Sequence, residues 1–166
     1  MPPRTDHDHP GVRRVVDALS AAGLPGARHV RMLDADVRTA AQAAEALGVE
    51  VGAIANSLVF DAGGAPLLAL TSGAHRADTA RLAELAGVTA VGKAAPDFVR
   101  THTGQPIGGV APAGHPAPIR TFVDAALRRY PVVWAAAGHP KAVFPTTFDE
   151  LVALTGGQVA ELAVRA

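Results

Sequence analysis

The sequence contains no cysteine, which removes several kinds of chemistry at once. No disulfide, thiolate metal site or cysteine nucleophile is available to the chain. The absence agrees with life in a reducing compartment, and we predict a cytoplasmic location. Serine is also scarce: only Ser20, Ser57 and Ser72 occur, and none stands in a recognisable nucleophile setting.

The sequence also lacks an excess of charge of one sign and any long apolar run. Fifteen basic residues balance fifteen acidic ones, so no broad positive field attracts nucleic acid, which would have to be met locally. No run approaches the roughly 20 apolar residues that span a bilayer. Asp6, His7, Asp8 and His9 stand where a secretory leader needs an apolar core. We predict a soluble protein with no membrane partner.

The sequence does contain enough apolar material for one substantial core. Hydrophobic residues make up 49% of the 166 residues and charged residues 18%, a balance typical of globular domains. We predict a flexible, polar tail over residues 1–10 and a single domain over residues 11–166. No internal repeat and no linker is evident.

Apolar spacing, capping residues and glycine stops predict an irregular alternation of helices and strands. Two apolar runs, 54–60 and 66–71, are joined by Asp61-Ala-Gly-Gly-Ala, which is typical of a hairpin turn. Because hairpin joints occur among crossover joints, we predict a mixed α+β fold, with a mixed, partly barrel-like sheet surrounded by helices rather than a doubly wound parallel sheet. The predicted helices are 11–22, 37–47, 78–85, 96–99 and 147–154, with a helical turn at 125–129. The predicted strands are 28–33, 54–60, 66–71, 88–91, 119–123, 132–136 and 143–144; for 159–164, strand and helix both stay open.

The segment 104–115 combines four glycines with two prolines and cannot be regular structure. Glycines allow close backbone approach and positive φ, whereas Pro106 and Pro112 stiffen the segment. A loop of this kind can present its peptide N–H groups in a fixed, concave arrangement that suits an anion or a developing oxyanion. The alternative is an ordinary surface connection, because glycine and proline gather in loops anyway.

Several common catalytic motifs are missing from the sequence. We find no GxxxxGK[ST], no GxGxxG after a strand, no HExxH and no GxSxG, so nucleotide hydrolysis, zinc proteolysis and α/β-hydrolase chemistry have no support. His102, His115 and His139 stand in or beside loops and, if they converged, would suit a metal-dependent hydrolase. No residues that would orient these histidines as metal ligands are recognisable around them, and we predict no metal and no cofactor.

The glycine-rich segment resembles the hallmark of the YbaK/EbsC family, which is related to the editing domain inserted in bacterial prolyl-tRNA synthetases. The resemblance extends over most of the chain. The residues that carry it are Phe98-Val-Arg100-x-x-Thr103-Gly104-x-x-Ile107-Gly108-Gly109-Val110-x-Pro112-x-Gly114 and Thr121-Phe122-Val123-Asp124, supported by Leu47-Gly48-Val49, Asn56-Ser57-Leu58-Val59-Phe60, Ala137-Gly138-His139-Pro140 and Phe148-x-Glu150-Leu151.

The resemblance implies a free-standing, trans-acting deacylase that hydrolyses tRNA mischarged with a small amino acid. It implies the acceptor end of that tRNA as partner, with an aminoacyl-tRNA synthetase as a further possible partner. An aminoacyl ester is already reactive, so its hydrolysis chiefly needs a placed water and a stabilised oxyanion, for which each backbone N–H contributes about 3 kcal/mol. The implied catalytic residues are Asn56, Gly108, Gly109, Pro112 and Gly114.

One departure from the family concerns Asn56, which stands where the family usually carries a lysine that meets the terminal nucleotide. Asparagine supplies no charge and is not a general base. Three interpretations follow: Asn56 positions the ester or a water, Lys93 or Arg76 supplies the charge from elsewhere, or this member is a weak or inactive deacylase. The competing function is a non-catalytic module that binds a tRNA end, an aminoacyl adenylate or a synthetase. The predicted substrate-binding residues are Ser57, Thr71, Ser72, Lys93, Arg100 and His139.

Overall fold

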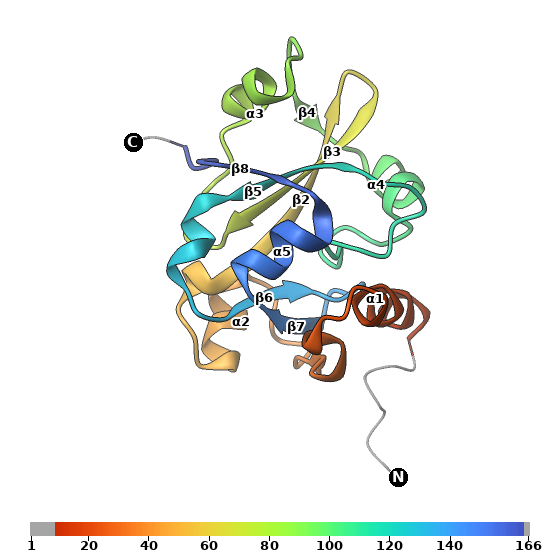
Figure 1. Cartoon of the computed structure of the whole chain (residues 1–166), viewed down its shortest axis with the longest axis vertical. Coiled ribbons are helices and arrows are strands. Elements are labelled where there is room, and N and C mark those ends of the chain that lie inside the picture. The colour runs from red at the N-terminus through yellow and green to blue at the C-terminus, as the bar shows by residue number, and fades with distance from the viewer. Residues whose placement is uncertain (1–8, 165–166) are drawn as a thin grey trace.

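The computed structural model describes residues 9–164, which form one mixed β-sheet with helices around it (Figure 1). Seven of the eight described strands follow the order β1-β7-β6-β2-β3-β5-β8, and the eighth, β4, pairs with β2 off this path. Antiparallel and parallel pairs adjoin, which confirms the mixed sheet. The strands are β1 (Arg31–Met32), β2 (Ile54–Ala62), β3 (Ala65–Ser72), β4 (Gly92–Lys93), β5 (Arg120–Asp124), β6 (Val133–Ala136), β7 (Ala142–Thr146) and β8 (Gln158–Ala160). The α-helices are α1 (Pro10–Ala21), α2 (Ala40–Leu47), α3 (Thr79–Ala86), α4 (Pro96–Thr103) and α5 (Phe148–Thr155), with 3-10 turns η1 (Pro25–Arg28), η2 (Val51–Ala53) and η3 (Ala125–Arg129).

The predicted hairpin forms the centre of the sheet. Strands β2 and β3 pair antiparallel along their whole length, from Ala55 opposite Ser72 to Ala62 opposite Ala65. The turn between them is Gly63-Gly64, and both glycines have positive φ, which side-chain-bearing residues rarely adopt. Asp61 closes the turn by accepting a 2.7 Å hydrogen bond from the Gly64 N–H.

Capping residues set where the helices begin. Thr147 and Glu150 form the predicted capping box at α5, and Asp78 caps α3 as predicted. Helix α2 begins at Ala40 rather than near residue 37, because Thr39 and Gln42 form a second capping box there. Helix α1 begins at Pro10, capped by His9; residues 1–8 of the predicted tail lie outside the described residues.

The strand predicted at 88–91 is wrong. The Val88 N–H still donates to the Ala83 carbonyl, and Gly87 adopts a left-handed φ of 71°, so the C-terminal cap of α3 occupies the start of this segment. Pairing with β2 begins only at Gly92. The strand predicted at 28–33 shrinks to β1. Of the segment 159–164, for which strand and helix were both open, only the start belongs to a strand, β8, which ends at Ala160.

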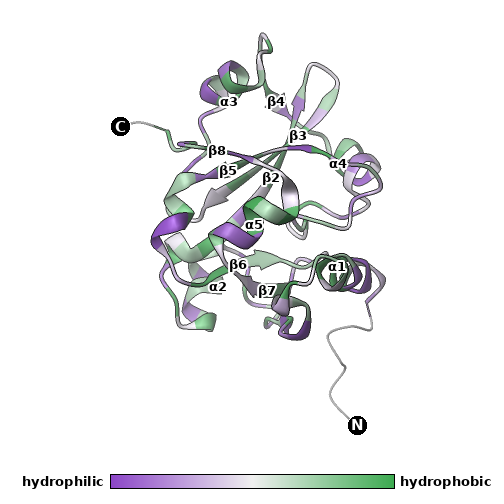
Figure 2. Cartoon of the chain, in the orientation of Figure 1, coloured by the Kyte–Doolittle hydropathy of each residue, from purple (hydrophilic) through white to green (hydrophobic). Residues whose placement is uncertain are grey.

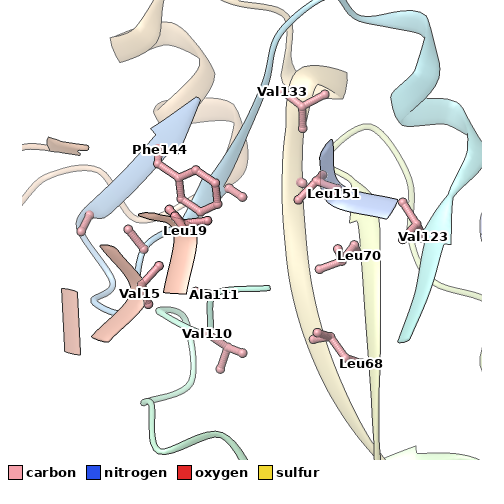
Figure 3. Packing of buried hydrophobic residues seen from close by; sticks show 14 of the residues in the cluster. Val15, Leu19, Leu68, Leu70, Val110, Ala111, Val123, Val133, Phe144 and Leu151 are labelled. Carbon is pink, nitrogen blue, oxygen red and sulfur yellow. The ribbon is translucent and has the colours of Figure 1, made fainter. Parts of the chain in front are cut away.

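The main core lies between the hairpin, helix α1 and strands β6 and β7. Figure 3 shows Val15 and Leu19 of α1 facing Phe144, with Val110 and Ala111 of the glycine loop between α1 and Leu68. All six are buried. Figure 2 shows that α1 alternates between apolar and polar residues, as a helix with one packed face should. None of the described helices is long and apolar enough to cross a membrane.

Candidate active site

A cavity of about 650 Å³ lies where the central sheet divides. On the side away from β3, strand β2 pairs with β6 only at Ile54 and Ala55 and with β4 only at Phe60 and Asp61. Residues 56–59 therefore form an open edge within the sheet. The cavity is lined by Leu33, Val37, Arg38, Thr39, Ala40, Ala43, residues 54–60, Lys93, Ala94, Val99, Ile107, Gly108, Val110, Trp134, Ala135, Ala136, Pro140, Lys141 and Val143.

The backbone of Ser57 faces this opening. The Gly73 N–H donates to the Ile54 carbonyl, which makes Ile54 a hydrogen-bonded pair position of the β2–β3 ladder. In an antiparallel ladder such positions alternate along the strand, so Asn56 also turns its backbone groups to β3 and Ser57 turns its own away. Neither β4 nor β6 extends to Ser57, so its N–H and C=O are placed to meet a ligand.

The side chains of Asn56 and Ser57 point to opposite faces of the sheet, because strand side chains alternate. Asn56 shares its face with Ile54, which packs against α2. Ser57 shares its face with Ala55 and Val59, toward the main core. The Ser57 hydroxyl is buried and has no hydrogen-bond partner among residues 9–164, although it belongs to the cavity wall. A buried hydroxyl of this kind offers a hydrogen bond to whatever enters.

Gln105 holds the glycine loop in shape. Its side chain is 2% exposed; Oε1 accepts a 2.6 Å hydrogen bond from the Ala111 N–H and Nε2 donates to the Ala113 carbonyl at 3.1 Å. At the same time its backbone N–H donates to the Thr103 hydroxyl, which in turn donates to the Val99 carbonyl. The loop is therefore fixed from within, as its prolines and glycines suggested.

The peptide N–H groups of the loop divide into two sets. Gly109 donates to the Pro106 carbonyl at 3.0 Å, closing a turn in which Gly108 has φ +88°, and the Ala111 N–H is held by Gln105. The N–H groups of Gly108 and Val110 have no partner among residues 9–164, and both residues line the cavity. Gly108 and Val110, rather than Gly109, are thus the loop residues whose peptide N–H groups remain available for a ligand.

Gly109, Pro112 and Gly114 lie off the cavity wall. Gly109 is buried against the loop after β6: a Cβ there would stand 2.7 Å from the His139 carbonyl carbon and the Pro140 nitrogen. Gly114 packs beside Val15 of α1 and Gln105, and Pro112 is buried. These three residues contribute the shape of the loop.

Four of the residues predicted to bind substrate also stand away from the wall. Ser72 donates from its hydroxyl to the Gly52 carbonyl at 2.8 Å, at the end of the hairpin. Thr71 pairs opposite Asn56 and its buried hydroxyl has no partner among the described residues. Arg100 is exposed on α4.

His139 is the fourth of these residues. Its Nδ1 accepts a 3.0 Å hydrogen bond from the Lys141 N–H. Its ring lies edge-on to the ring of His9, with 4.7 Å between the two ring centroids. Burial lowers the pKa of His139, helped by the neighbouring His9 and Lys141. Elsewhere, His115 Nε2 donates to the Ala111 carbonyl at 2.8 Å and the His102 ring packs on Phe98, so the three loop histidines have separate partners. No three described His, Asp or Glu residues are grouped in a way that suits a metal ion.

The charged residues of the cavity wall are all cations: Arg38, Lys93 and Lys141. No carboxylate lines it, although the whole chain has as many acidic as basic residues. The cavity therefore favours an anionic ligand, locally and without a broad positive surface.

A family model for the aminoacyl-tRNA editing domain matches residues 34–154. The chain belongs to this family. The glycine loop, the β2 edge and both lysines fall within the matched region, and the resemblance drawn from the loop is confirmed.

Relatives and solved structures agree with the editing domain. Uncharacterized protein YwhH of Bacillus subtilis is 32% identical over 114 residues, 68% of this chain and 72% of the relative. A proline–tRNA ligase of Nitratidesulfovibrio vulgaris is 29% identical over 119 residues, which cover 72% of this chain but only 19% of the ligase. A crystal structure of a candidate trans-editing enzyme for prolyl tRNA synthetase has TM-score 0.86 and 45% identity, covering 95% of this chain and 99% of the other. The hypothetical protein APE2540 has TM-score 0.80 and 30% identity, covering 91% and 99%.

Sequence reasoning missed several features of this editing domain. Arg38, Trp134 and Lys141 line the cavity, and Gln105 organises the loop beside it. None belongs to a recognisable motif. These residues lie close to the opening beside β2. They are brought there by the pairing of strands that are remote in sequence, which no local pattern reveals.

Proposed function

We propose that this protein is a free-standing aminoacyl-tRNA deacylase, which hydrolyses the ester of tRNA mischarged with a small amino acid. The observation that carries the proposal is the cavity in the divided sheet. Its wall contains Ser57 and the N–H groups of Gly108 and Val110, which have no partner among residues 9–164, and its charged residues are all positive. Family membership supports the same reaction class.

The reaction needs no nucleophilic side chain. Water, held by the free hydroxyl of the terminal ribose, attacks the ester carbonyl carbon, and the oxygen that becomes negative accepts hydrogen bonds from Gly108 and Val110 N–H. The bond to the ribose oxygen then breaks, that oxygen takes the proton lost by water, and tRNA and the free amino acid leave. Each preorganised donor lowers the barrier by about 3 kcal/mol. Asn56, which donates and accepts, positions the ester or the water.

The expectation of a small amino acid comes from the resemblance to the editing family. Four alanines, Ala55, Ala94, Ala135 and Ala136, line the cavity together with larger apolar side chains such as Leu58, Phe60 and Trp134. A pocket that admits small side chains and excludes large ones acts as the second sieve of an editing scheme. We therefore expect substrates such as alanyl-, cysteinyl- or seryl-tRNA, delivered freely or by a synthetase.

Asn56 favours a second candidate function, a module that binds a tRNA end or an aminoacyl adenylate without turnover. The residue stands on the open strand where a charged side chain would reach the cavity, and it carries no charge. This candidate predicts saturable binding and no release of amino acid, and Asn56→Lys would then create hydrolysis.

The test is release of amino acid from the three mischarged tRNAs by wild type, Asn56→Ala and Asn56→Lys. We expect time-dependent release by wild type, unaffected by chelator, and a loss of at least tenfold in Asn56→Ala with an unchanged melting temperature. If wild type at high concentration releases nothing from any of the three, deacylation is refuted. If Asn56→Ala abolishes an activity that wild type has, the binding-only function is refuted.

A further inference from the structure

Both lysines of the chain line the cavity, but they are held differently. Lys93 is exposed on the short strand β4. Lys141 is half-buried, and its backbone is fixed at both ends: its N–H donates to His139 Nδ1 and its carbonyl accepts from the Leu33 N–H at 2.7 Å. Its ammonium donates to the carbonyl of Val37, in the segment before α2. Lys141 is thus a cation whose position is set before any ligand arrives.

The ammonium keeps binding capacity after this contact. A lysine ammonium has three N–H donors, and the Val37 carbonyl takes one. Because Lys141 is already ordered, an anion that binds it does not incur most of the usual loss of side-chain freedom. No carboxylate of the cavity wall neutralises it.

We propose that the Lys141 ammonium binds a phosphate oxygen of the 3′-terminal nucleotide of the RNA. Lys141, in the loop between β6 and β7, would thereby supply the positive charge that Asn56 lacks. The inference rests on the proposed function. An aminoacyl ester carries a neutral carbonyl and a cationic amine, so the anions of such a substrate are its phosphates. Lysine binds phosphate as a point charge, which needs no planar geometry. Lys141 would therefore fix how far the terminal nucleotide enters, and with it the place of the ester beside Gly108.

The test is binding of an uncharged acceptor-stem RNA hairpin, measured by fluorescence anisotropy over a range of salt concentrations. The proteins are wild type, Lys141→Met, Lys141→Arg and the control Arg129→Met, which removes one charge from an exposed residue of η3 outside this cavity. We expect Lys141→Met to weaken binding about 10-fold at low salt and to reduce the slope of log affinity against log salt by about 0.7, the value for one phosphate contact on a single strand. Lys141→Arg should keep the slope, and Arg129→Met should leave it unchanged.

Two outcomes overturn the proposal. If Lys141→Met melts at a lower temperature but keeps the wild-type salt slope, the lysine only tethers the segment at Val37. If the wild-type protein shows no measurable binding at low salt, no phosphate contact exists. Neither outcome depends on turnover: deacylation can fail while the salt slope still supports Lys141, and deacylation can succeed while an unchanged slope refutes it.

Discussion

Replacing Gln105 by leucine tests whether the glycine loop is held from within. Leucine has a similar volume but removes both side-chain hydrogen bonds, which leaves the buried Ala111 N–H and the Ala113 carbonyl without their partners. An orphaned buried backbone group costs about 1–3 kcal/mol. We therefore expect the free energy of unfolding to fall by about 2–4 kcal/mol.

The Gln105→Leu substitution should also lower kcat, because it loosens the neighbouring peptide groups of the loop. Val110 directly precedes Ala111, so its N–H loses its fixed direction when the Ala111 contact is lost. Loss of one oxyanion donor costs about 100-fold or more in kcat, and we expect a fall of that order in single-turnover deacylation.

The assay for stability is urea denaturation at constant m-value, so that a shift of the midpoint reports the folded state. Gln42→Leu is the matched control, because the Gln42 side chain also makes two hydrogen bonds to the backbone. It accepts both, from the Arg38 and Thr39 N–H groups, at an exposed helix start, and its loss should cost only about 1 kcal/mol. If Gln105→Leu unfolds at the wild-type midpoint and retains wild-type kcat, the loop is not organised by this side chain and the reasoning fails.

Three further predictions concern the loop, the β2 edge and pH. Gly109→Ala should cost about 2–3 kcal/mol in urea denaturation, because its Cβ would meet the backbone at His139 and Pro140 at 2.7 Å, whereas a wild-type midpoint would show that the loop yields easily. Ser57→Ala should leave stability equal or raise it by about 1 kcal/mol, since it removes an unpaired buried hydroxyl, yet lower kcat/KM about tenfold; equal activity would exclude a substrate contact. Burial lowers the pKa of His115 and His139, so folding favours their neutral forms and the stability they contribute is complete above about pH 6.5 and lost as pH falls through the folded pKa values. Melting temperatures from pH 7.5 to 5 should fall less steeply in the double variant His115→Gln/His139→Gln, and an equal slope would refute the assignment.

Local signals in the sequence predicted most of the elements. The capping box at Thr147, the cap at Asp78 and the Gly63-Gly64 turn each act within a few residues, so the residues that determine them are visible together in the sequence. The strand predicted at 88–91 was wrong because another local signal, the C-terminal cap of α3 at Gly87, competes there with strand formation. The apolar content of the segment does not reveal which of the two structures forms.

The site was less predictable because it depends on where pairing stops. Asn56, Ser57 and Gly108 were found from the resemblance and do line the cavity, but the opening itself exists because β4 and β6 leave β2 at different points. Lys141 lies 85 residues after Asn56 in the sequence, and its side chain is held at the cavity by a hydrogen bond to the Val37 carbonyl. No sequence pattern predicts a contact between such distant residues.

The opening in β2 also bears on how the protein avoids self-association. A bare strand margin ordinarily invites a foreign chain to add itself and propagate aggregates. Here the bare stretch spans only residues 56–59 and is bracketed by β6 at one end and β4 at the other, so an intruding strand would collide with both before it could align. The short length of the gap thus protects the main-chain groups of residues 56–59 from pairing with a foreign strand, although nothing in the sheet covers them.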